Sequence, residues 1–366
     1  MVEWKKIGDI MQIVRGASPR PIKNYITSDN NGVNWIKIGD VAPGAKYITR
    51  CNEKITKEGA EKSRYLHAGD FILSNSMSFG RPYILKIDGC IHDGWIAMSD
   101  YEKSVSSGYL YEILNSKVVQ DYWKMKANNG GAMTNLNSDI VKDTIIPIPS
   151  LSEQNRIVGI LDTFTASIDN LNEQIAQRRK QYEYYRDQLL DLEGKEGVEM
   201  KALGEVCEIS RGVRVVKRDL EEFGIIPVFQ NSLLPLGYYA VSNNNGNTFV
   251  IIGGAAGDIG YSEKPFWAAD DCLCISGKIV LVDKYIYNFL ISVQHYLKSQ
   301  VRKAGVPRLS RSVLDKLCIP VPPLTEQQRI VSILDAFEAS IQNLEAQLSQ
   351  REKQYEYYRN KLLTFE

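Results

Sequence analysis

The residue types that most often perform catalysis are few in this chain, and their spacing forms no familiar site. The histidines His67, His92 and His295 are far apart, and none has the spacing to a cysteine, serine or aspartate that marks a nucleophile site, although residues distant in sequence can still meet in a fold. None of the six cysteines forms a CxxC pair, so we expect reduced, mostly buried thiols rather than disulfides or zinc ligands. The run GGAAGDIG at residues 253–260 lacks the lysine of a phosphate-binding loop and is predicted to join two strands.

Two further enzyme signatures are missing or misplaced. The Asp/Asn-Pro-Pro-Tyr/Phe run of amino-methyltransferases does not occur, and residues 321–324, which read VPPL, lead into a predicted helix. Residues 191–195, which read DLEGK, resemble the carboxylate and lysine spacing of nucleases, but they fall in a predicted hinge. The sequence therefore predicts no catalytic site, no metal site and no cofactor in this chain.

Positively charged side chains gather instead in loops at matching places in the two halves of the chain. The 44 lysines and arginines balance 44 acidic residues overall, yet residues 1–146 carry about +3 and residues 194–319 about +2. Arginine and lysine hold DNA by its phosphates, whereas arginine, asparagine and glutamine also read base edges. For any single residue a solvated surface is the alternative, and the recurrence in both halves favours DNA. The residues predicted to bind DNA are Arg15, Arg20, Lys23, Arg81, Lys126, Asn128, Asn129, Arg211, Arg214, Lys217, Arg218, Arg302, Lys303, Arg308 and Arg311.

The elements that must position these residues are repeated. Residues 146–193 and 319–366 align without a gap, with roughly 31 of 48 positions identical. A shorter echo precedes each copy, EWKKIGDIMQIVRG at residues 3–16 and EMKALGEVCEISRG at residues 199–212. The segments between the echoes differ, which suggests one shared task and two individual ones.

Each long repeat predicts a helix. Apolar residues recur at alternating steps of four and three from Ile157 to Leu192 and from Ile330 to Phe365, which is the seam of a coiled coil. About 40 residues at a rise of 1.5 Å give a rod of roughly 60 Å. Prolines precede each helix, and Ser152 or Thr325 is predicted to cap it.

One seam position in each helix holds an arginine, Arg178 or Arg351. Either this arginine fixes the register of the pair, or its stem covers apolar surface while its head reaches water. The run QYEYYR, which contains Tyr182 in the first copy and Tyr355 in the second, is interpreted as packing.

We expect an α+β fold of two globular, mostly-β domains with the two helices paired antiparallel and related by a pseudo-twofold axis. Such pairing would place the domains at opposite ends of the rod. Runs such as DFILSNS, DCLCIS and KIVLV predict strands. The predicted divisions are a first domain at 1–150, a helix at 151–193, a hinge at 194–198, a second domain at 199–322 and a helix at 323–366.

The lead-in I-P-[IV]-P-x-L-[ST]-E-Q-x-R-I, the helix after it and the divergent domain before each copy resemble the specificity subunit of a type I restriction–modification enzyme. The resemblance covers nearly the whole chain. It implies two target-recognition domains that each read one half of a split, asymmetric DNA sequence. It also implies two modification subunits that methylate adenine with S-adenosylmethionine, restriction subunits in the full complex and no catalysis in this chain. Separately, the sequence contains no apolar run long enough to cross a bilayer and no charged-then-apolar leader, so we expect a soluble, cytoplasmic protein.

The near-identical helices are the expected docking surface for those modification subunits. A coiled-coil scaffold that binds only protein is the alternative function. The residues predicted to serve docking or the coiled coil are Glu153, Gln154, Arg156, Arg178, Tyr182, Glu326, Gln327, Arg329, Arg351 and Tyr355.

Overall fold

The computed structural model describes residues 2–42, 44–75, 79–101, 103–127, 135–278 and 280–365. The chain divides into two compact units. Unit 1 comprises Met1–Asn170 and Leu348–Glu366, and unit 2 comprises Leu171–Gln347. Each long helix therefore contributes one part to each unit.

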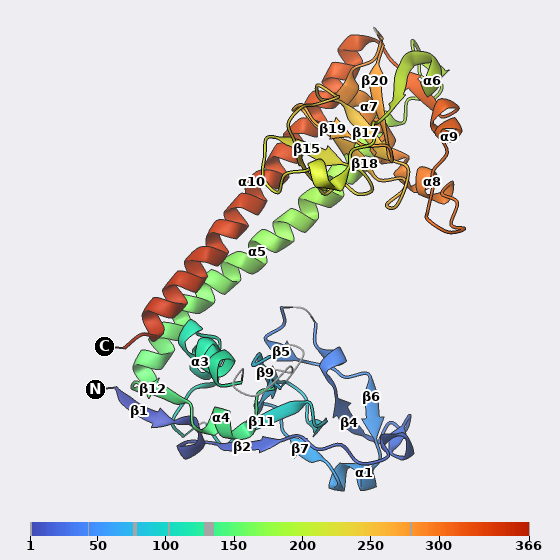
Figure 1. Ribbon diagram of the computed structural model, residues 1–366. Coiled ribbons are helices and arrows are strands. Elements are labelled where there is room, and N and C mark those ends of the chain that lie inside the picture. The colour runs from blue at the N-terminus through green and yellow to red at the C-terminus, as the bar shows by residue number, and fades with distance from the viewer. Residues whose placement is uncertain are drawn as a thin grey trace. The chain divides into compact units, whose positions relative to one another are not determined.

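Unit 1 is mostly β (Figure 1). Its sheets have the strand orders β1-β12, β3-β6-β4-β10-β7 and β2-β11-β8-β9-β5. The strands are β1 (Glu3–Lys6), β2 (Gln12–Arg15), β3 (Ile26–Thr27), β4 (Val33–Ile36), β5 (Tyr47–Ile48), β6 (Glu53–Ile55), β7 (Arg64–Leu66), β8 (Phe71–Ser74), β9 (Pro82–Leu85), β10 (Gly89–Ile91), β11 (Trp95–Ser99) and β12 (Ile145–Ile148). The helices of its globular part are η1 (Ile7–Asp9), η2 (Ile22–Asn24), η3 (Ile38–Asp40), α1 (Lys57–Glu61), α2 (Ser107–Leu114), α3 (Lys117–Ala127) and α4 (Ser138–Lys142).

The central strands of unit 1 are apolar on both faces because each face is covered. In β8, Phe71 and Leu73 join the core that includes residues of α2 and α3, whereas Ile72 joins a second core on the other face. Strand β11 alternates in the same way, with Ile96 in the first core and Trp95 in the second. A continuous apolar run is the expected sequence of a strand that is buried on both sides.

Unit 2 repeats this plan with fewer strands. Its sheets have the orders β13-β21, β14-β20-β17-β18 and β16-β15-β19. The strands are β13 (Glu199–Ala202), β14 (Cys207–Arg211), β15 (Ile226–Phe229), β16 (Gly237–Tyr239), β17 (Thr248–Ile251), β18 (Ile259–Tyr261), β19 (Trp267–Ala268), β20 (Cys272–Gly277) and β21 (Cys318–Val321). The helices of its globular part are α6 (Leu203–Val206), η5 (Lys217–Asp219), α7 (Asp283–Ser292), α8 (Gln294–Ser299) and α9 (Arg311–Asp315). In β20, Cys272 and Cys274 face one core and Leu273 faces the other.

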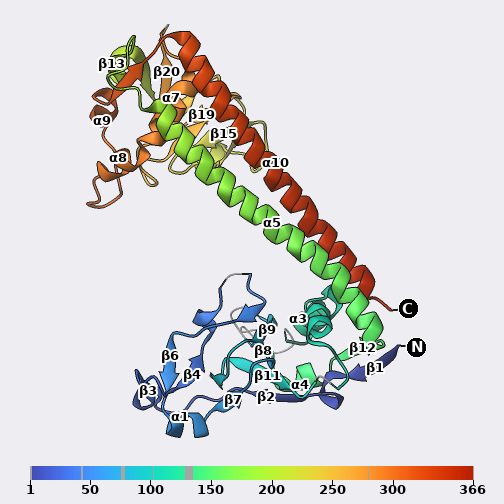
Figure 2. The same ribbon diagram turned by 180° about the vertical axis from the view of Figure 1, so that it is seen from behind.

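The long helices are α5 (Leu151–Leu190) and α10 (Leu324–Leu363), which lie side by side in both views (Figures 1 and 2). In unit 2, Tyr185 stacks on Phe337 with ring centroids 5.5 Å apart, and Arg179 pairs with Glu345 at 2.6 Å. Residue numbers rise along one helix as they fall along the other, so the helices pair antiparallel. In unit 1 the equivalent stack joins Phe164 to Tyr358 at 5.3 Å.

The first apolar residues of each seam pack into the core of the globular part of the unit. Ile157 and Leu161 are fully buried in the main core of unit 1, and Ile330 and Leu334 are fully buried in that of unit 2. The expected α+β fold, with two mostly-β domains and two long antiparallel helices, is confirmed.

Two local predictions are wrong. The hydroxyl that caps α5 belongs to Ser150, whose Oγ accepts from the Glu153 amide at 3.3 Å, because the helix begins one residue before Ser152. In the second copy that place is occupied by Pro323, whose carbonyl oxygen accepts from the Glu326 amide. The described part of KIVLV forms no strand, because the Leu281 amide turns back to the Lys278 carbonyl and α7 follows.

Within the described residues no helix is long and apolar enough to cross a membrane. Among the same residues no cluster of three histidine, cysteine or acidic side chains has the geometry to hold a metal ion.

Candidate nucleic-acid interface

Arg15 ends β2 and projects from the edge where several segments of unit 1 meet. The next residue, Gly16, approaches the main chain so closely that a Cβ atom would lie 2.0 Å from the His92 carbonyl oxygen. Its amide donates to the Trp95 carbonyl at 2.8 Å. The glycine of the Arg-Gly echo therefore allows β2 to pass directly over the turn that precedes β11.

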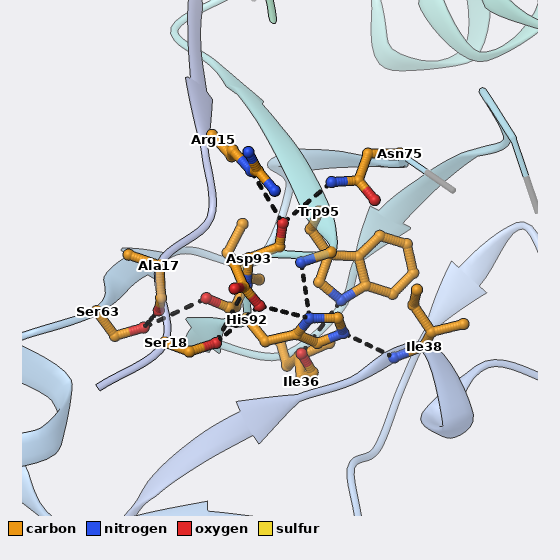
Figure 3. Close-up of polar contacts among 12 residues, drawn as sticks. Arg15, Ala17, Ser18, Ile36, Ile38, Ser63, Asn75, His92, Asp93 and Trp95 are labelled. Carbon is orange, nitrogen blue, oxygen red and sulfur yellow. Dashed lines mark hydrogen bonds and ion pairs between the residues drawn. The ribbon is translucent and has the colours of Figure 1, made fainter. Parts of the chain in front are cut away.

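Asp93, in that turn, binds side chains from two segments, residues 15–20 and Asn75 (Figure 3). Its main-chain oxygen accepts from Arg15 Nε at 3.1 Å and from Asn75 Nδ2 at 3.0 Å. Its carboxylate accepts from Ser18 Oγ at 3.0 Å and faces Arg20 Nη2 at 3.4 Å. Burial raises the pKa of Asp93, but the hydrogen bonds from Ser18 and from its own amide, together with the charge of Arg20, outweigh it, so the pKa lies below its usual value.

His92 supports this turn from beneath. Its Nδ1 accepts from the Gly94 amide at 2.8 Å, and its Nε2 lies 3.3 Å from the amide of Ile38 (Figure 3). Burial lowers the pKa of His92, which favours the neutral ring. The histidine thus links the turn to η3 at the end of β4.

A hollow of about 620 Å³ opens beside the turn. Arg15, Asn75 and Asp93 line one part of it, and Asn135 and Asn137 line another. We call residues 135–137, just before α4, the late loop of unit 1, and residues 300–310, just before α9, the late loop of unit 2. The late loop of unit 1 is held there because the Leu136 amide donates to the Asn75 carbonyl at 2.9 Å. Positive, amide and carboxylate groups therefore line part of this hollow, beside the apolar side chains of Ile38, Ile96 and Leu136.

Unit 2 builds the same arrangement from different residues. Arg211, at the end of β14, donates from Nε to the Asp270 main-chain oxygen at 2.8 Å. A Cβ atom on Gly212 would lie 2.1 Å from the Ala269 carbonyl oxygen. The Leu309 amide donates to the Ile252 carbonyl at 3.0 Å, as Leu136 does to Asn75 in unit 1. We call these two places cluster 1, around Arg15 and Asp93, and cluster 2, around Arg211 and Asp270.

The late loop of unit 2 brings more predicted DNA-binding residues to cluster 2. Arg302 and Arg308 exchange backbone hydrogen bonds of 2.9 and 3.1 Å, which closes a hairpin-like turn that carries the exposed Lys303. Arg308 Nη1 also lies 3.0 Å from the carboxylate of Asp271, next to Asp270. Arg211, at the end of β14, and Arg308, in the late loop, therefore bind the neighbouring residues Asp270 and Asp271, although 97 positions separate the two arginines in the sequence.

Other predicted DNA-binding residues of unit 1 are placed outside cluster 1. Lys23 is exposed in η2. Arg81 is half-buried, with its guanidinium 5.8 Å from the centroid of the Tyr83 ring, and Lys126 is exposed on α3. The predicted residues Asn128 and Asn129 lie outside the described residues.

In unit 2, Arg214 and Arg218 are exposed between β14 and β15, and Arg218 faces Asp219 at 3.5 Å. Arg311 begins α9 and faces Asp315 at 3.4 Å. The backbone of Lys217 lies in η5, and its side chain is outside the described part of the chain.

Sequence reasoning missed several residues of the clusters. Asn75, Asp93 and Asn135 in unit 1, and Asp271 in unit 2, follow strands or lie in loops without a distinctive spacing. Arg15 and Asp93 are 78 positions apart and meet only because β2 pairs with β11. A closer comparison of the two halves around the Arg-Gly echo was the one available signal.

The predicted docking residues divide into exposed and buried sets. Glu153 and Arg156 form a two-bond ion pair at 2.7 and 2.8 Å in the first turn of α5. Glu326 and Arg329 repeat it at the same two distances in α10. Each pair is partly exposed, and its arginine lowers the pKa of the glutamate.

Gln154 and Gln327 are fully buried and serve their own units. In unit 1, Gln154 accepts from the Ser106 amide at 2.8 Å and donates to the Ser104 and Pro149 carbonyls at 3.1 and 3.0 Å. Gln327 makes the equivalent three bonds in unit 2. These two residues are therefore unavailable to a partner, because the start of each helix is bound through them to its own globular part.

The seam arginines contact aromatic rings of the facing helix. The Arg178 guanidinium lies 5.9 Å from the centroid of Phe337, and that of Arg351 lies 5.7 Å from Phe164. Such contacts stabilise a half-exposed arginine in a seam by about 0.5–1 kcal/mol. The head of each arginine therefore lies against a ring of the facing helix, and a role of the two arginines in fixing the register stays a prediction.

Tyr182 and Tyr355 pack against the globular parts. Tyr355 donates its hydroxyl to Glu112 Oε2 at 2.8 Å in unit 1, and Tyr182 donates to Glu338 Oε1 at 3.2 Å in unit 2. Glu112 is almost fully buried, and burial raises its pKa. In unit 2, the position of α7 that corresponds to Glu112 of α2 holds Asn288, which is buried and neutral.

Comparisons with known proteins agree with this duplicated plan. The family model of the type I restriction modification DNA specificity domain matches residues 1–178 and 195–352. A Haemophilus influenzae protein that carries the name of a type I restriction enzyme specificity subunit is 28% identical over 400 residues, covering 100% of this chain and 96% of that protein. The specificity subunit of the Escherichia coli type I restriction enzyme EcoR124I/EcoR124II is 33% identical over 261 residues, covering 60% of this chain and 63% of that protein.

A solved structure from work on complex assembly and conformational transition of the type I R-M system has the same fold. It matches with a TM-score of 0.69 at 17% identity, and the match covers 99% of this chain and 97% of that chain.

Proposed function

Because the chain belongs to the family of type I restriction–modification DNA specificity subunits, we propose that each of its units reads one half of a split, asymmetric DNA target. The family consists of DNA-recognition subunits that are not themselves catalytic. The alternative of a coiled-coil scaffold that binds only protein is not favoured, because the specificity family matches both halves of the chain.

The observation that carries this proposal is that clusters 1 and 2 have the same backbone arrangement but different side chains. Clusters 1 and 2 share the Arg-Gly step, the turn beneath it and the bond from the late loop. Around that shared frame, cluster 1 presents asparagine side chains, whereas cluster 2 presents Arg308 and Asp271. A shared backbone arrangement with different polar side chains is what we expect of two domains that recognise different DNA sequences.

Subunits of this family function in complexes with modification and restriction subunits and with DNA. We propose that two modification subunits bind this chain, because the exposed Glu-Arg pair at the start of the long helix occurs twice in identical form. S-adenosylmethionine would bind to those modification subunits rather than to this chain. A cytoplasmic location is the corresponding proposal for the whole complex.

Docking is tested by reversing the charge of one exposed pair in each helix. Co-expression of the modification subunit with a chain carrying Glu153→Lys, Arg156→Glu, Glu326→Lys and Arg329→Glu is expected to give less co-purified complex than the unchanged chain does. The pairs themselves each contribute about 0–1 kcal/mol to folding, so the changed chain should remain folded by circular dichroism. Full co-purification by the folded variant would exclude these pairs as the docking surface.

The long helices are proposed to set the distance between the two half-sites. Each is a single helix of 40 residues, or about 60 Å at 1.5 Å per residue. A DNA turn is about 34 Å, so the helices are long enough for half-sites separated by about one to two turns.

The function is tested by mapping methylated adenines in a host that carries this chain together with its modification subunit. The expected result is methylation within a single two-part sequence that is absent from the host without the chain. Methylation confined to one continuous short sequence would contradict the reading of a split target by two units. Complete absence of methylation by a complex that assembles would contradict the function itself.

A further inference from the structure

We propose that Arg15 and Arg211 hold DNA phosphates without regard to sequence, and that discrimination between bases comes from the residues that differ between the clusters, chiefly Asn135 and Arg308. The inference rests on the proposed function and assigns the two kinds of contact within it.

The two arginines are oriented in the same way by the protein. Each uses Nε to donate to a main-chain oxygen, that of Asp93 at 3.1 Å or that of Asp270 at 2.8 Å. Within the described residues, the terminal nitrogens of both guanidinium groups have no hydrogen-bond partner. A guanidinium held by Nε presents its terminal nitrogens as a fixed fork, and this fork matches the two oxygens of a phosphate.

The identity of the two arginines argues against base reading. Side chains that select bases are expected to differ between two readers of different sequences, whereas a phosphate contact is the same at every base pair. Arg15 and Arg211 have the same residue type, the same anchoring bond and the same glycine after them. They are therefore suited to a part of DNA that both half-sites share.

The residues immediately before the late-loop leucines, unlike the two arginines, differ between the clusters. Asn135 precedes Leu136, and Arg308 precedes Leu309, and each leucine amide makes the equivalent bond to the end of the neighbouring strand, at 2.9 and 3.0 Å. Both side-chain types read bases, but asparagine suits adenine and arginine suits guanine. The backbone thus delivers two different base-reading groups to one equivalent place.

Cluster 2 also contains a residue that orients its reader. Arg308 Nη1 lies 3.0 Å from Asp271 Oδ1, and the arginine is 56% exposed while the aspartate is 18% exposed. The Ile252 amide donates to the Asp271 carbonyl just as the Asn75 amide donates to the Gly94 carbonyl, so Asp271 takes the place of Gly94. Cluster 2 therefore has both Arg308 and the carboxylate that orients it, whereas cluster 1 has Asn135 and a glycine at the two corresponding positions.

The test uses the full chain assembled with its modification subunits and labelled duplexes that carry the target found by methylation mapping, together with duplexes that each change one base pair of it. Fluorescence anisotropy measures affinity over a series of salt concentrations. Arg15→Ala or Arg211→Ala is expected to weaken binding about 10-fold on every duplex, to leave their ranking unchanged and to lower the salt dependence by about one phosphate contact. Arg15→Lys keeps the charge, so it should retain the salt dependence while losing part of the affinity, because lysine cannot reproduce the anchored fork.

Arg308→Ala supplies the contrast, and it is expected to reorder the duplexes that differ in one half-site and no others. Lys180→Ala, which removes a positive charge from the exposed side of α5, controls for charge loss and should change neither affinity nor ranking. Circular dichroism confirms that each variant is folded.

A changed ranking with Arg15→Ala or Arg211→Ala would show that these arginines read bases, and unchanged affinity and salt dependence would show that they do not touch DNA. Either result overturns the inference while leaving the proposed function intact. An unchanged complex that binds all duplexes equally would overturn the proposed function and this inference with it.

Discussion

Gln154 offers the sharpest test of how the long helix is joined to unit 1. The side chain is fully buried and makes three hydrogen bonds, with the Ser106 amide and with the Ser104 and Pro149 carbonyls. Leucine has a similar size but can form none of these bonds. Gln154→Leu therefore removes the polar link while largely preserving the packing.

The expected cost follows from the three bonds. A net contribution of about 1 kcal/mol for each gives about 3 kcal/mol, and the desolvated Ser106 amide left without a partner adds about 1 kcal/mol. A loss of about 4 kcal/mol is a large share of the 5–15 kcal/mol that stabilises a typical domain. For a unit of roughly 190 residues it corresponds to a fall of about 10 °C in the melting temperature.

Urea unfolding followed by tryptophan fluorescence measures this loss, because four of the five tryptophans lie in unit 1. The matched control is Gln177→Leu in the same helix, where the exposed glutamine bonds only to Glu173 in the described residues, at 3.0 Å. The control is expected to change stability by less than about 0.5 kcal/mol. If Gln154→Leu is no more destabilising than Gln177→Leu, the buried glutamine does not hold the helix to unit 1 as argued.

Three further predictions concern the pH response of unit 1, the close approach at cluster 1 and the length of the helices. Burial raises the pKa of Glu112 above its value of 4.5 in the unfolded chain, so the stability that its protonated form confers is lost as pH rises from 4.5 through the folded-state pKa. Glu112→Gln, which imitates the neutral Asn288 of unit 2, should remove that decline in urea unfolding measured from below pH 4.5 upward, and an unchanged pH profile would contradict it. Gly16→Ala places a Cβ 2.0 Å from the His92 carbonyl oxygen and is expected to lower the free energy of unfolding, measured thermally, by about 2–4 kcal/mol. The control Gly39→Ala, with no atom within 4 Å of its Cβ, should lower it far less. Equal effects would argue against the contact. Deleting one heptad from both long helices removes about 10 Å from each and should shorten the spacer found by methylation mapping by about 3 base pairs, and an unchanged spacer would exclude the helices as its determinant.

Much of the architecture was readable because it depends on local periodicity. The alternating steps of four and three between Ile157 and Leu192 require a helix with one apolar face, and the duplicate seam supplies its partner. The apolar runs around Phe71 and Cys272 predict strands. These patterns repeat within a few residues, so they need no knowledge of distant contacts.

The errors arose where a distant group decides a local choice. KIVLV has the composition of a strand, but its last residues pack under the start of α7, and Val282 donates its amide to Gln327 from 45 positions away. The sequence places Gln154 among the residues predicted to serve docking or the coiled coil, because nothing in the repeat indicates that the globular part of unit 1 buries this side chain. Burial of a polar side chain depends on which partners the tertiary structure brings within hydrogen-bond distance.

The sequence alone determined the duplication, the two long helices, the mostly-β character of the two domains and the absence of familiar catalytic motifs, since each of these is written in residue type and short-range spacing. The tertiary structure alone decided which charged residues stand together. Arg15 meets Asp93 from 78 positions away because β2 pairs with β11, and Arg211 meets Asp270 from 59 positions away because β14 pairs with β20. Arg308 reaches the neighbouring Asp271 from 37 positions away. Strand pairing joins segments through backbone hydrogen bonds that every residue can make, so the side chains that meet leave no spacing in the sequence by which to find them.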